Sequence, residues 1–182
     1  RDRRDHLHRI VERYDVVVVG AGNAGLTAAL SAAEHGASVL VLEKAPEYLR
    51  GGNTYFTGGL FRFAYDGIDD VAGVVADLGP VERATVDVGS YFEATYYSDL
   101  MRVTEGRADP DLGRTLVSES LPTMVWMRDR GVRWVLAHGR QAFRTDGVSR
   151  FWGGLVVEAV GGGKDLSDRL FELASGAGVN VL

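Results

Sequence analysis

The stretch that decides the fold is Tyr14-Asp15-Val16-Val17-Val18-Val19-Gly20-Ala21-Gly22-Asn23-Ala24-Gly25. An apolar run leads into a glycine turn, and good helix formers follow it. A second apolar run covers residues 38–42 and ends at Glu43. Strand, glycine turn, helix, strand and acid appear in the order that a dinucleotide-binding βαβ unit requires. The sequence therefore predicts two parallel strands joined by a helix over about residues 23–35.

Each glycine of the turn has a physical role in such a unit. Gly20 permits the tight turn, Gly22 lets the backbone approach a pyrophosphate, and Gly25 lets the helix pack on the strand. The helix N-terminus offers N–H groups to phosphates, and the Glu43 carboxylate is expected to accept hydrogen bonds from ribose hydroxyls. The candidate cofactor-binding residues of this unit are Gly20, Gly22, Asn23, Ala24, Gly25, Glu43 and Lys44.

Composition excludes several function classes. The net charge of −5 and the pI of about 5.4 argue against nucleic acid as a partner. The chain has no cysteine, which excludes disulfides, thiolate metal sites, iron–sulfur ligation and a cysteine nucleophile. No apolar stretch approaches the roughly 18 residues that a membrane span needs, and no signal peptide pattern is present. We expect a cytoplasmic protein without a metal site, in which His6 and His8 belong to a solvated, charged lead-in.

The rest of the chain divides into segments of different character. Residues 44–69 are expected to form a long functional loop. A helix is predicted from Asp109-Pro110, with a break near Pro122. The remaining expectations are a strand over 132–137, hairpin or irregular structure over 138–160, a helix over 165–175 and a new strand from 179. The aromatic residues expected to pack in a core or interface are Tyr91, Phe92, Tyr96 and Tyr97.

A second glycine motif is Arg50-Gly51-Gly52-Asn53-Thr54-Tyr55-Phe56-Thr57-Gly58-Gly59. A glycine-rich backbone can lie against a flat ring and point N–H groups at it. Asn53 and Thr54 can hydrogen-bond a ring edge or phosphates. The candidate cofactor-binding residues of this motif are Gly51, Gly52, Asn53, Thr54, Thr57, Gly58 and Gly59.

Together, the glycine turn at residues 20–25, the pair Glu43-Lys44 and this second motif resemble the flavin domain of the fumarate reductase/succinate dehydrogenase flavoprotein family. The run 50–67 looks closest to its tricarballylate dehydrogenase-like branch. Residues 109–132 resemble the start of the family's capping domain, and residues 161–179 resemble the return helix into the flavin domain.

The resemblance implies an α/β fold: a Rossmann-like FAD-binding domain of the glutathione reductase type with the beginning of an inserted α+β capping domain. We expect a truncated, N-terminal part of a larger protein, because a small parallel sheet with an open edge is a poor stable unit. The implied division is a lead-in (1–13), the first part of the FAD-binding domain (14–108), a partial capping domain (109–160), and a return helix and strand (161–182).

The resemblance also implies a function. It predicts a flavoprotein oxidoreductase that uses FAD to transfer hydride to or from a small di- or tricarboxylate, with a possible electron-transfer partner protein. Some family members attach FAD covalently through a histidine at the position of Asn53, and asparagine cannot form that bond, so non-covalent FAD is predicted. The family's catalytic motifs have no match in this chain, whose catalytic residues are therefore unknown, and the chain alone is expected to be inactive.

Arginines are the candidates for binding a carboxylate substrate, because a guanidinium grips a carboxylate bidentately. The chain offers Arg62, Arg140, Arg144 and Arg150. Arg144 and Arg150 are the substrate candidates that we single out, since they flank an apparent Asp146-Gly147 turn. His35 is expected to close the first helix, and His138 is expected to be exposed in a turn.

Two alternatives stay open at this point. A ketosteroid dehydrogenase-like flavoenzyme is one, and the aromatic residues Phe143, Phe151 and Trp152 allow it. The other is a nucleotide-binding module without turnover, although a plain NAD-binding unit has no need of the Gly51–Gly59 motif.

Overall fold

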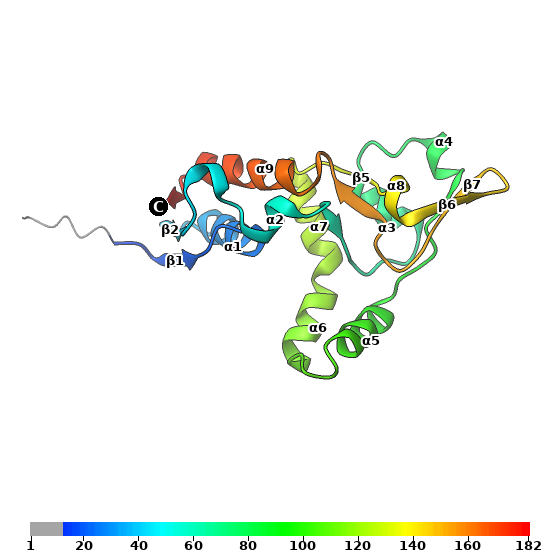
Figure 1. Ribbon diagram of the computed structural model, residues 1–182, viewed down its shortest axis with the longest axis horizontal. Coiled ribbons are helices and arrows are strands. Elements are labelled where there is room, and N and C mark those ends of the chain that lie inside the picture. Colours follow the sequence, from blue (N-terminus) through cyan, green and yellow to red (C-terminus); the bar gives the residue numbers. More distant parts are fainter. Residues whose placement is uncertain (1–12) are drawn as a thin grey trace, which may run out of the picture.

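The structure is a computed structural model that describes residues 13–182; the expectations for the lead-in, with His6 and His8, fall almost wholly outside this range. Figure 1 shows the order of the elements along the chain. They are β1 (Val16–Val19), α1 (Asn23–Glu34), β2 (Val39–Leu42), a 3-10 turn (Glu47–Leu49), α2 (Gly52–Phe56), β3 (Leu60–Phe61), α3 (Ile68–Val74), α4 (Pro80–Arg83), β4 (Val86–Asp87), α5 (Glu93–Val103), α6 (Pro110–Ser118), α7 (Ser120–Asp129), β5 (Trp134–Leu136), α8 (His138–Gln141), β6 (Ala142–Thr145), β7 (Val148–Phe151), β8 (Val157–Ala159), α9 (Gly162–Gly176) and β9 (Asn180–Val181).

The predicted βαβ unit is present. β1 and β2 pair in parallel with Val16 opposite Val39, and β9 pairs in parallel with the other edge of β2, so the strand order is β1-β2-β9. Helix α1 ends at Glu34 with His35 as its C-cap, and Gly36 follows with a φ of +85°, a conformation that favours glycine. The new strand expected from residue 179 is thus the third strand of the parallel sheet.

One face of this sheet is covered and the other is open among the described residues. Val39 and Val41 are buried, whereas Val17 and Val19 are 53% and 83% exposed. The apolar run of β1 predicts burial on both faces, and this expectation is wrong here. Successive right-handed crossovers that move in one direction across a parallel sheet place their helices, α1 and α9, on the same face.

The segment 44–69 contains more regular structure than the expected loop. Helix α2 begins after Gly51, whose φ of +105° needs a glycine, and packs against α9. Strand β3 follows and pairs antiparallel with β8. A contact with α9, distant in sequence, therefore orders a segment whose glycines predict an irregular loop.

The outer part of the molecule is built from short antiparallel and mixed pairings. β8 lies between β3 and β5, while β7 pairs antiparallel with β6 and in parallel with β4. Asp146 and Gly147, with φ of 51° and 81°, form the β6–β7 turn, so the hairpin expected in this region is confirmed.

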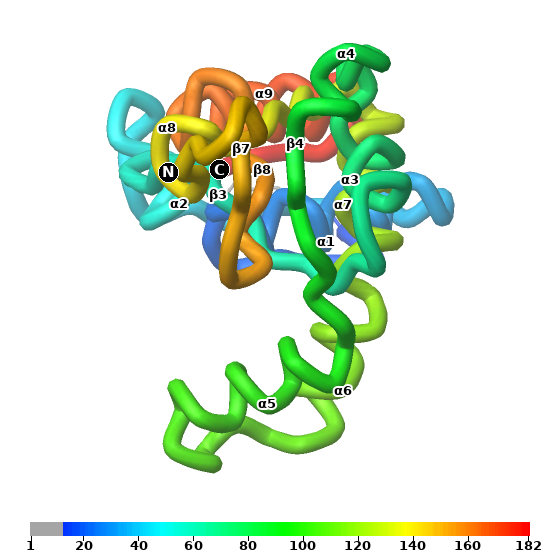
Figure 2. The backbone as a smooth tube through the Cα atoms, turned by 90° about the vertical axis from the view of Figure 1, so that its right-hand side faces the viewer, coloured from blue at the N-terminus to red at the C-terminus, as the bar shows by residue number. Residues whose placement is uncertain are grey.

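Two helices form an arm that projects from the body (Figure 2). The arm consists of α5 and α6, and Asp109 caps α6 by accepting hydrogen bonds from the N–H groups of Asp111 (2.9 Å) and Leu112 (3.0 Å). The predicted helix break is confirmed at Glu119, where α6 ends and α7 begins. Pro122 lies in the first turn of α7, where a missing N–H is tolerated.

The aromatic cluster is only partly internal. Tyr91 is buried and its ring centroid lies 5.5 Å from that of Tyr96, as expected for core packing. Phe92 is exposed, against that expectation. Because Phe92 is the N-cap of α5, its side chain lies at the base of the projecting arm rather than in the body.

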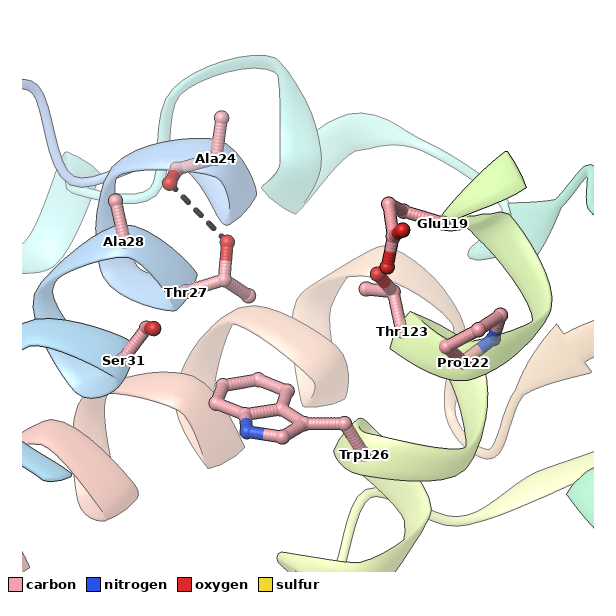
Figure 3. A pocket seen from close by; sticks show the side chains of 8 residues that line it. All are labelled: Ala24, Thr27, Ala28, Ser31, Glu119, Pro122, Thr123 and Trp126. Carbon is pink, nitrogen blue, oxygen red and sulfur yellow. Dashed lines mark hydrogen bonds between the residues drawn. The ribbon is translucent and has the colours of Figure 1, made fainter. Parts of the chain in front are cut away.

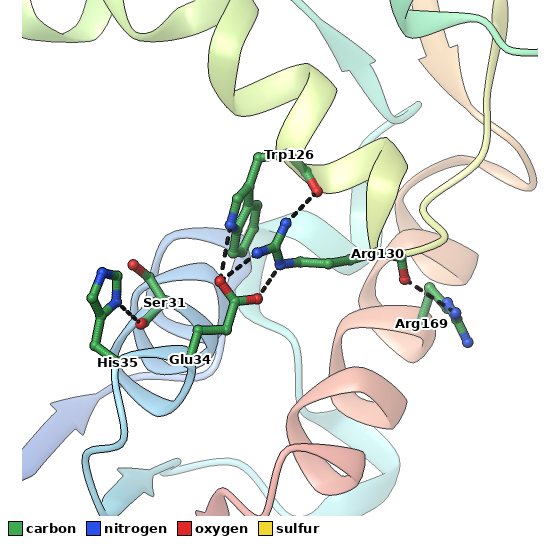
Figure 4. A network of polar contacts seen from close by, with 6 residues as sticks. All are labelled: Ser31, Glu34, His35, Trp126, Arg130 and Arg169. Atoms are coloured by element: carbon green, nitrogen blue, oxygen red, sulfur yellow. Dashed lines mark hydrogen bonds and ion pairs between the residues drawn. The ribbon is translucent and has the colours of Figure 1, made fainter.

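A polar junction fastens α1 to α7 (Figure 4). Glu34, at the end of α1, accepts a hydrogen bond from the Trp126 indole (3.1 Å) and forms an ion pair with Arg130. The Arg130 guanidinium also lies over the Trp126 ring, 4.0 Å from its centroid. Arg169 of α9 donates to the Arg130 carbonyl oxygen (3.2 Å), so three helices meet at this junction.

Candidate functional site

The glycine turn at residues 20–25 requires glycine at Gly20 for its backbone conformation and at Gly25 for close packing. Gly20 has a φ of +97°, which favours glycine. A Cβ on Gly25 would overlap the Gly20 carbonyl oxygen and lie 3.1 Å from the Gly20 carbonyl carbon. The first turn of α1 can therefore approach β1 only without that side chain. Gly22 is the N-cap of α1 in an extended conformation.

The two glycine motifs meet at the N-terminus of α1. The Asn23 backbone N–H donates to the Thr54 hydroxyl of α2 (2.9 Å). A Cβ on Gly22 would lie 3.7 Å from the Gly51 carbonyl oxygen and 3.7 Å from Thr54 Oγ1. Segments 31 residues apart in the sequence thus form one surface.

Glu43 fastens the turn to the end of β2. Its carboxylate accepts hydrogen bonds from the N–H groups of Ala21 (2.8 Å) and Ala45 (2.8 Å). These backbone donors, Ala45 first, lower the pKa of Glu43 below its usual range, so the group is ionised at neutral pH. Each oxygen keeps a second lone pair for a hydroxyl donor. Lys44 is exposed beside it.

The segment 57–59 rests on the start of α9. The Gly163 N–H donates to the Thr57 carbonyl oxygen (3.0 Å), and a Cβ on Gly163 would lie 2.7 Å from that oxygen. A Cβ on Gly59 would lie 2.9 Å from the Gly162 carbonyl carbon. The sequence predicts this helix only from residue 165, whereas α9 begins at Gly162. The three consecutive glycines at 161–163 are the signal in the sequence that another segment packs closely there.

Ser167 completes this support. It is a buried polar residue of α9, and a Cβ on Gly51 would lie 3.3 Å from its Cβ. Gly51 therefore needs to be glycine for its backbone conformation and also for the approach of α9. Asn53 and Gly52 are exposed on the open side of α2, and a Cβ on Gly52 would meet nothing within 4 Å.

Ala24 and the face of α1 beyond it line a separate groove of about 510 Å³ (Figure 3). Ala24, Thr27, Ala28 and Ser31 lie on one side of this groove. The other side is formed by Glu119, Pro122, Thr123 and Trp126. Ala24 thus borders this groove, while its backbone belongs to the first turn of α1.

The candidate arginines lie in different places. Arg144 and Arg150 are on the β6–β7 hairpin, and Arg150 forms an ion pair with Asp87 of β4 (3.2 Å). Arg62 donates to the Gly153 carbonyl oxygen. Arg140 is the arginine that contacts the second glycine motif: a Cβ on Gly58 would lie 2.8 Å from its guanidinium carbon.

The two histidines of the described chain have structural surroundings. His35 closes α1 and its Nδ1 lies 2.7 Å from the Ser31 carbonyl oxygen. His138 is exposed as expected, but on α8 rather than in a turn, with Nε2 3.3 Å from Glu82. Across residues 13–182, no group of three or more histidine or acidic side chains has the arrangement of a metal site. In the same residues, no helix has both the length and the apolar character to span a membrane.

This geometry fits a dinucleotide. The first turn of α1 leaves N–H groups without intrahelical partners, the open side of Gly52 leaves room for a ligand backbone contact, and a carboxylate stands at the end of β2. These are the features of a dinucleotide-binding site with a second glycine segment beside it.

Comparison with known proteins shows the protein family to which the chain belongs. The family described as FAD binding domain matches residues 15–182, and the chain belongs to this family. It is an FAD-binding domain of the type found in flavoprotein oxidoreductases, and its cofactor is FAD.

Individual relatives share the class. Over 124 residues the chain is 36% identical to vinyl phenol reductase of Lactiplantibacillus plantarum, covering 68% of this chain and 21% of the relative. Over 119 residues it is 32% identical to NADH:fumarate oxidoreductase of Klebsiella pneumoniae, covering 65% of this chain and 11% of the relative. The solved 3-ketosteroid-delta4-(5alpha)-dehydrogenase of Rhodococcus jostii shares the fold, with a TM-score of 0.65 at 22% identity over 96% of this chain and 39% of that one. The chain therefore spans a minor part of each of these proteins.

Proposed function

We propose that this chain supplies the FAD site of an oxidoreductase that acts on a small di- or tricarboxylate, with FAD bound non-covalently. When bound, FAD supplies a hydride acceptor or donor at the flavin ring. The observation that carries the proposal is the meeting of both glycine motifs at the N-terminus of α1, through the Asn23–Thr54 hydrogen bond.

The chain's own residues divide the binding task. Gly20, Gly22 and the first turn of α1 (Asn23, Ala24 and Gly25) would hold the pyrophosphate. Glu43, beside Lys44, would accept the ribose hydroxyls. The flavin and its phosphate linker would lie along the second motif, at Gly51, Gly52, Asn53, Thr54, Thr57, Gly58 and Gly59.

Non-covalent binding rests on Asn53. Its amide lacks the nucleophilic nitrogen that a histidine offers, and both described histidines, His35 and His138, lie on other elements. The flavin should therefore leave the protein on denaturation.

The substrate class rests on the sequence of residues 50–67, which resembles the tricarballylate dehydrogenase-like branch. The named relatives act on a vinyl phenol and on fumarate, and both compounds contain a carbon–carbon double bond. The same proposal includes a capping domain over 109–160, an electron-transfer partner protein and a cytoplasmic location for this cysteine-free chain.

A second candidate is favoured by one observation. Phe143 and Trp152 are 46% and 62% exposed, and their ring centroids lie 5.3 Å apart. An exposed aromatic pair suits a flat apolar substrate such as a steroid. Adding citrate-like acids or 3-oxosteroids to the full-length protein and following flavin absorbance separates the two candidates.

The test of the cofactor site is a visible absorption spectrum before and after denaturation. A yellow protein that releases its flavin supports the proposal. Flavin that stays attached contradicts non-covalent binding, and a colourless protein that binds NAD contradicts the whole proposal.

Gly22→Val should abolish FAD retention with the fold intact, because a side chain would occupy the pyrophosphate position. Glu43→Ala should weaken FAD by about 1–3 kcal/mol, the range for a hydrogen bond to a charged group.

A further inference from the structure

The contact between Arg140 and Gly58 joins the outer part of the molecule to the second glycine motif. Helix α8 carries Arg140, and its guanidinium carbon would lie 2.8 Å from a Cβ on Gly58. Gly58 is not among the glycines with positive φ, so its backbone does not require glycine. The missing side chain at position 58 instead makes room for the Arg140 guanidinium.

Both partners of this contact are anchored by backbone hydrogen bonds. The carbonyl oxygens of Thr57 and Gly59 accept from the N–H groups of Gly163 (3.0 Å) and Ala159 (2.8 Å). On the other side, Ala137 at the start of α8 donates to the Val156 carbonyl oxygen (3.0 Å). The guanidinium is thus presented from fixed elements rather than from a free loop.

Among the described residues, the Arg140 guanidinium forms one ion pair, with Glu158. Its Nε lies 3.3 Å from Glu158 Oε2, and the two side chains are 55% and 24% exposed. A guanidinium has five N–H donors in a rigid fork, so a single ion pair through Nε leaves the two terminal nitrogens available. Arg150 on the β6–β7 hairpin is, in contrast, paired with Asp87 of β4.

We propose that Arg140 binds a carboxylate of the substrate and so determines the substrate class of the site. This inference rests on the proposed function, because Gly58 belongs to the segment assigned to the flavin. A forked cation on that segment places a carboxylate beside the reacting ring. Glu158 orients the fork by holding Nε, and acts as a positioning residue.

The experiment uses the full-length protein that contains this chain, with succinate and citrate as probes. Their dissociation constants are measured by the change in flavin absorbance for wild type, Arg140→Ala, Arg140→Lys and the matched control Arg133→Ala, which removes another exposed arginine nearby in sequence. FAD content is measured for each preparation.

We expect Arg140→Ala to keep its FAD and to bind both probes about 10- to 100-fold more weakly, the effect of losing a charge-assisted bidentate contact. The affinity of Arg140→Lys for both probes should fall between those of Arg140→Ala and wild type, since lysine keeps the charge but loses the forked geometry. The lysine variant also tests the proposal if the alanine variant does not fold. Arg133→Ala should match wild type. Probe binding should weaken with added salt in wild type and much less in Arg140→Ala.

Unchanged probe binding in Arg140→Ala would overturn the inference and leave the FAD site intact. Loss of FAD in that variant would assign Arg140 to the cofactor instead, which also overturns it. Wild type that binds FAD but only steroids refutes the carboxylate assignment, whereas wild type without FAD refutes the proposed function itself.

Discussion

The unit of β1, α1 and β2 and the outer sheet of β4, β6 and β7 differ in how far apart in sequence their partners lie. β1 and β2 begin 23 residues apart, as Val16 opposite Val39, and one glycine turn sets their geometry. In the outer sheet, Val86 of β4 pairs with Ser149 of β7. A pattern in a single stretch can specify the first unit, while the second depends on a distant partner.

The largest effect should come from the most tightly packed point of the first unit. Gly25→Ala would place a Cβ against the Gly20 carbonyl group, so we expect a loss of about 1–3 kcal/mol in the free energy of unfolding and loss of FAD. Gly73→Ala is the matched control, since Gly73 also lies in a helix and its Cβ would meet nothing within 4 Å. It should stabilise by about 0.5–1 kcal/mol. If urea unfolding gave the same change in the free energy of unfolding for both variants, Gly25 would not be needed for the close approach of α1 to β1.

A smaller effect is expected where the first unit joins α7. The Arg130 hydrogen bond lowers the pKa of the Glu34 carboxyl below its usual range. Arg130→Ala should lower the free energy of unfolding by about 1–2 kcal/mol, because the Arg130 and Glu34 side chains are only partly buried. Arg133→Ala, which removes an exposed pair with Asp77, should cost less than about 0.5 kcal/mol.

The same junction predicts a pH dependence. A lowered pKa in the folded state gives stability that is complete above the unfolded value, about 4.3, and that is lost as pH falls through the folded value. Glu34→Gln should therefore flatten the acid limb of the stability curve. An identical acid limb in the variant would show that Glu34 contributes nothing to it.

Tyr65 offers a test at high pH, within the core between the two regions. Burial raises the pKa of Tyr65 to about 12, and its hydroxyl donates to the Val88 carbonyl oxygen (2.9 Å). Its stabilising contribution is complete below the unfolded pKa of about 10 and is lost between there and pH 12. Tyr65→Phe should cost about 1 kcal/mol at neutral pH and show a weaker alkaline loss. Tyr48→Phe, at an exposed tyrosine, should change neither.

The smallest effect is expected in the outer sheet. Arg150→Ala breaks an ion pair whose two side chains are about half exposed, so thermal unfolding should change by less than about 0.5 kcal/mol. FAD retention should be unchanged. A loss comparable to that of Gly25→Ala would mean that the outer sheet and the first unit are equally coupled to the fold.

The sequence by itself determined the βαβ unit and the order of its parts, and its resemblance to a flavoprotein family determined the FAD class. The βαβ unit depends on short-range rules: glycine at a turn with positive φ, an apolar run in a parallel strand, and N–H groups free at a helix start. The break before α7 and the β6–β7 turn followed from the same kind of rule.

Tertiary structure alone decided which separated segments meet. Helix α2 formed in a segment expected to be a loop because α9 packs against it, and one face of β1 stayed open because both crossover helices lie on the other. The contact of Arg140 with Gly58 depends on pairing between strands β3 and β8, which begin nearly a hundred residues apart. No local pattern encodes such a contact, since it depends on packing between elements whose separation the sequence does not specify.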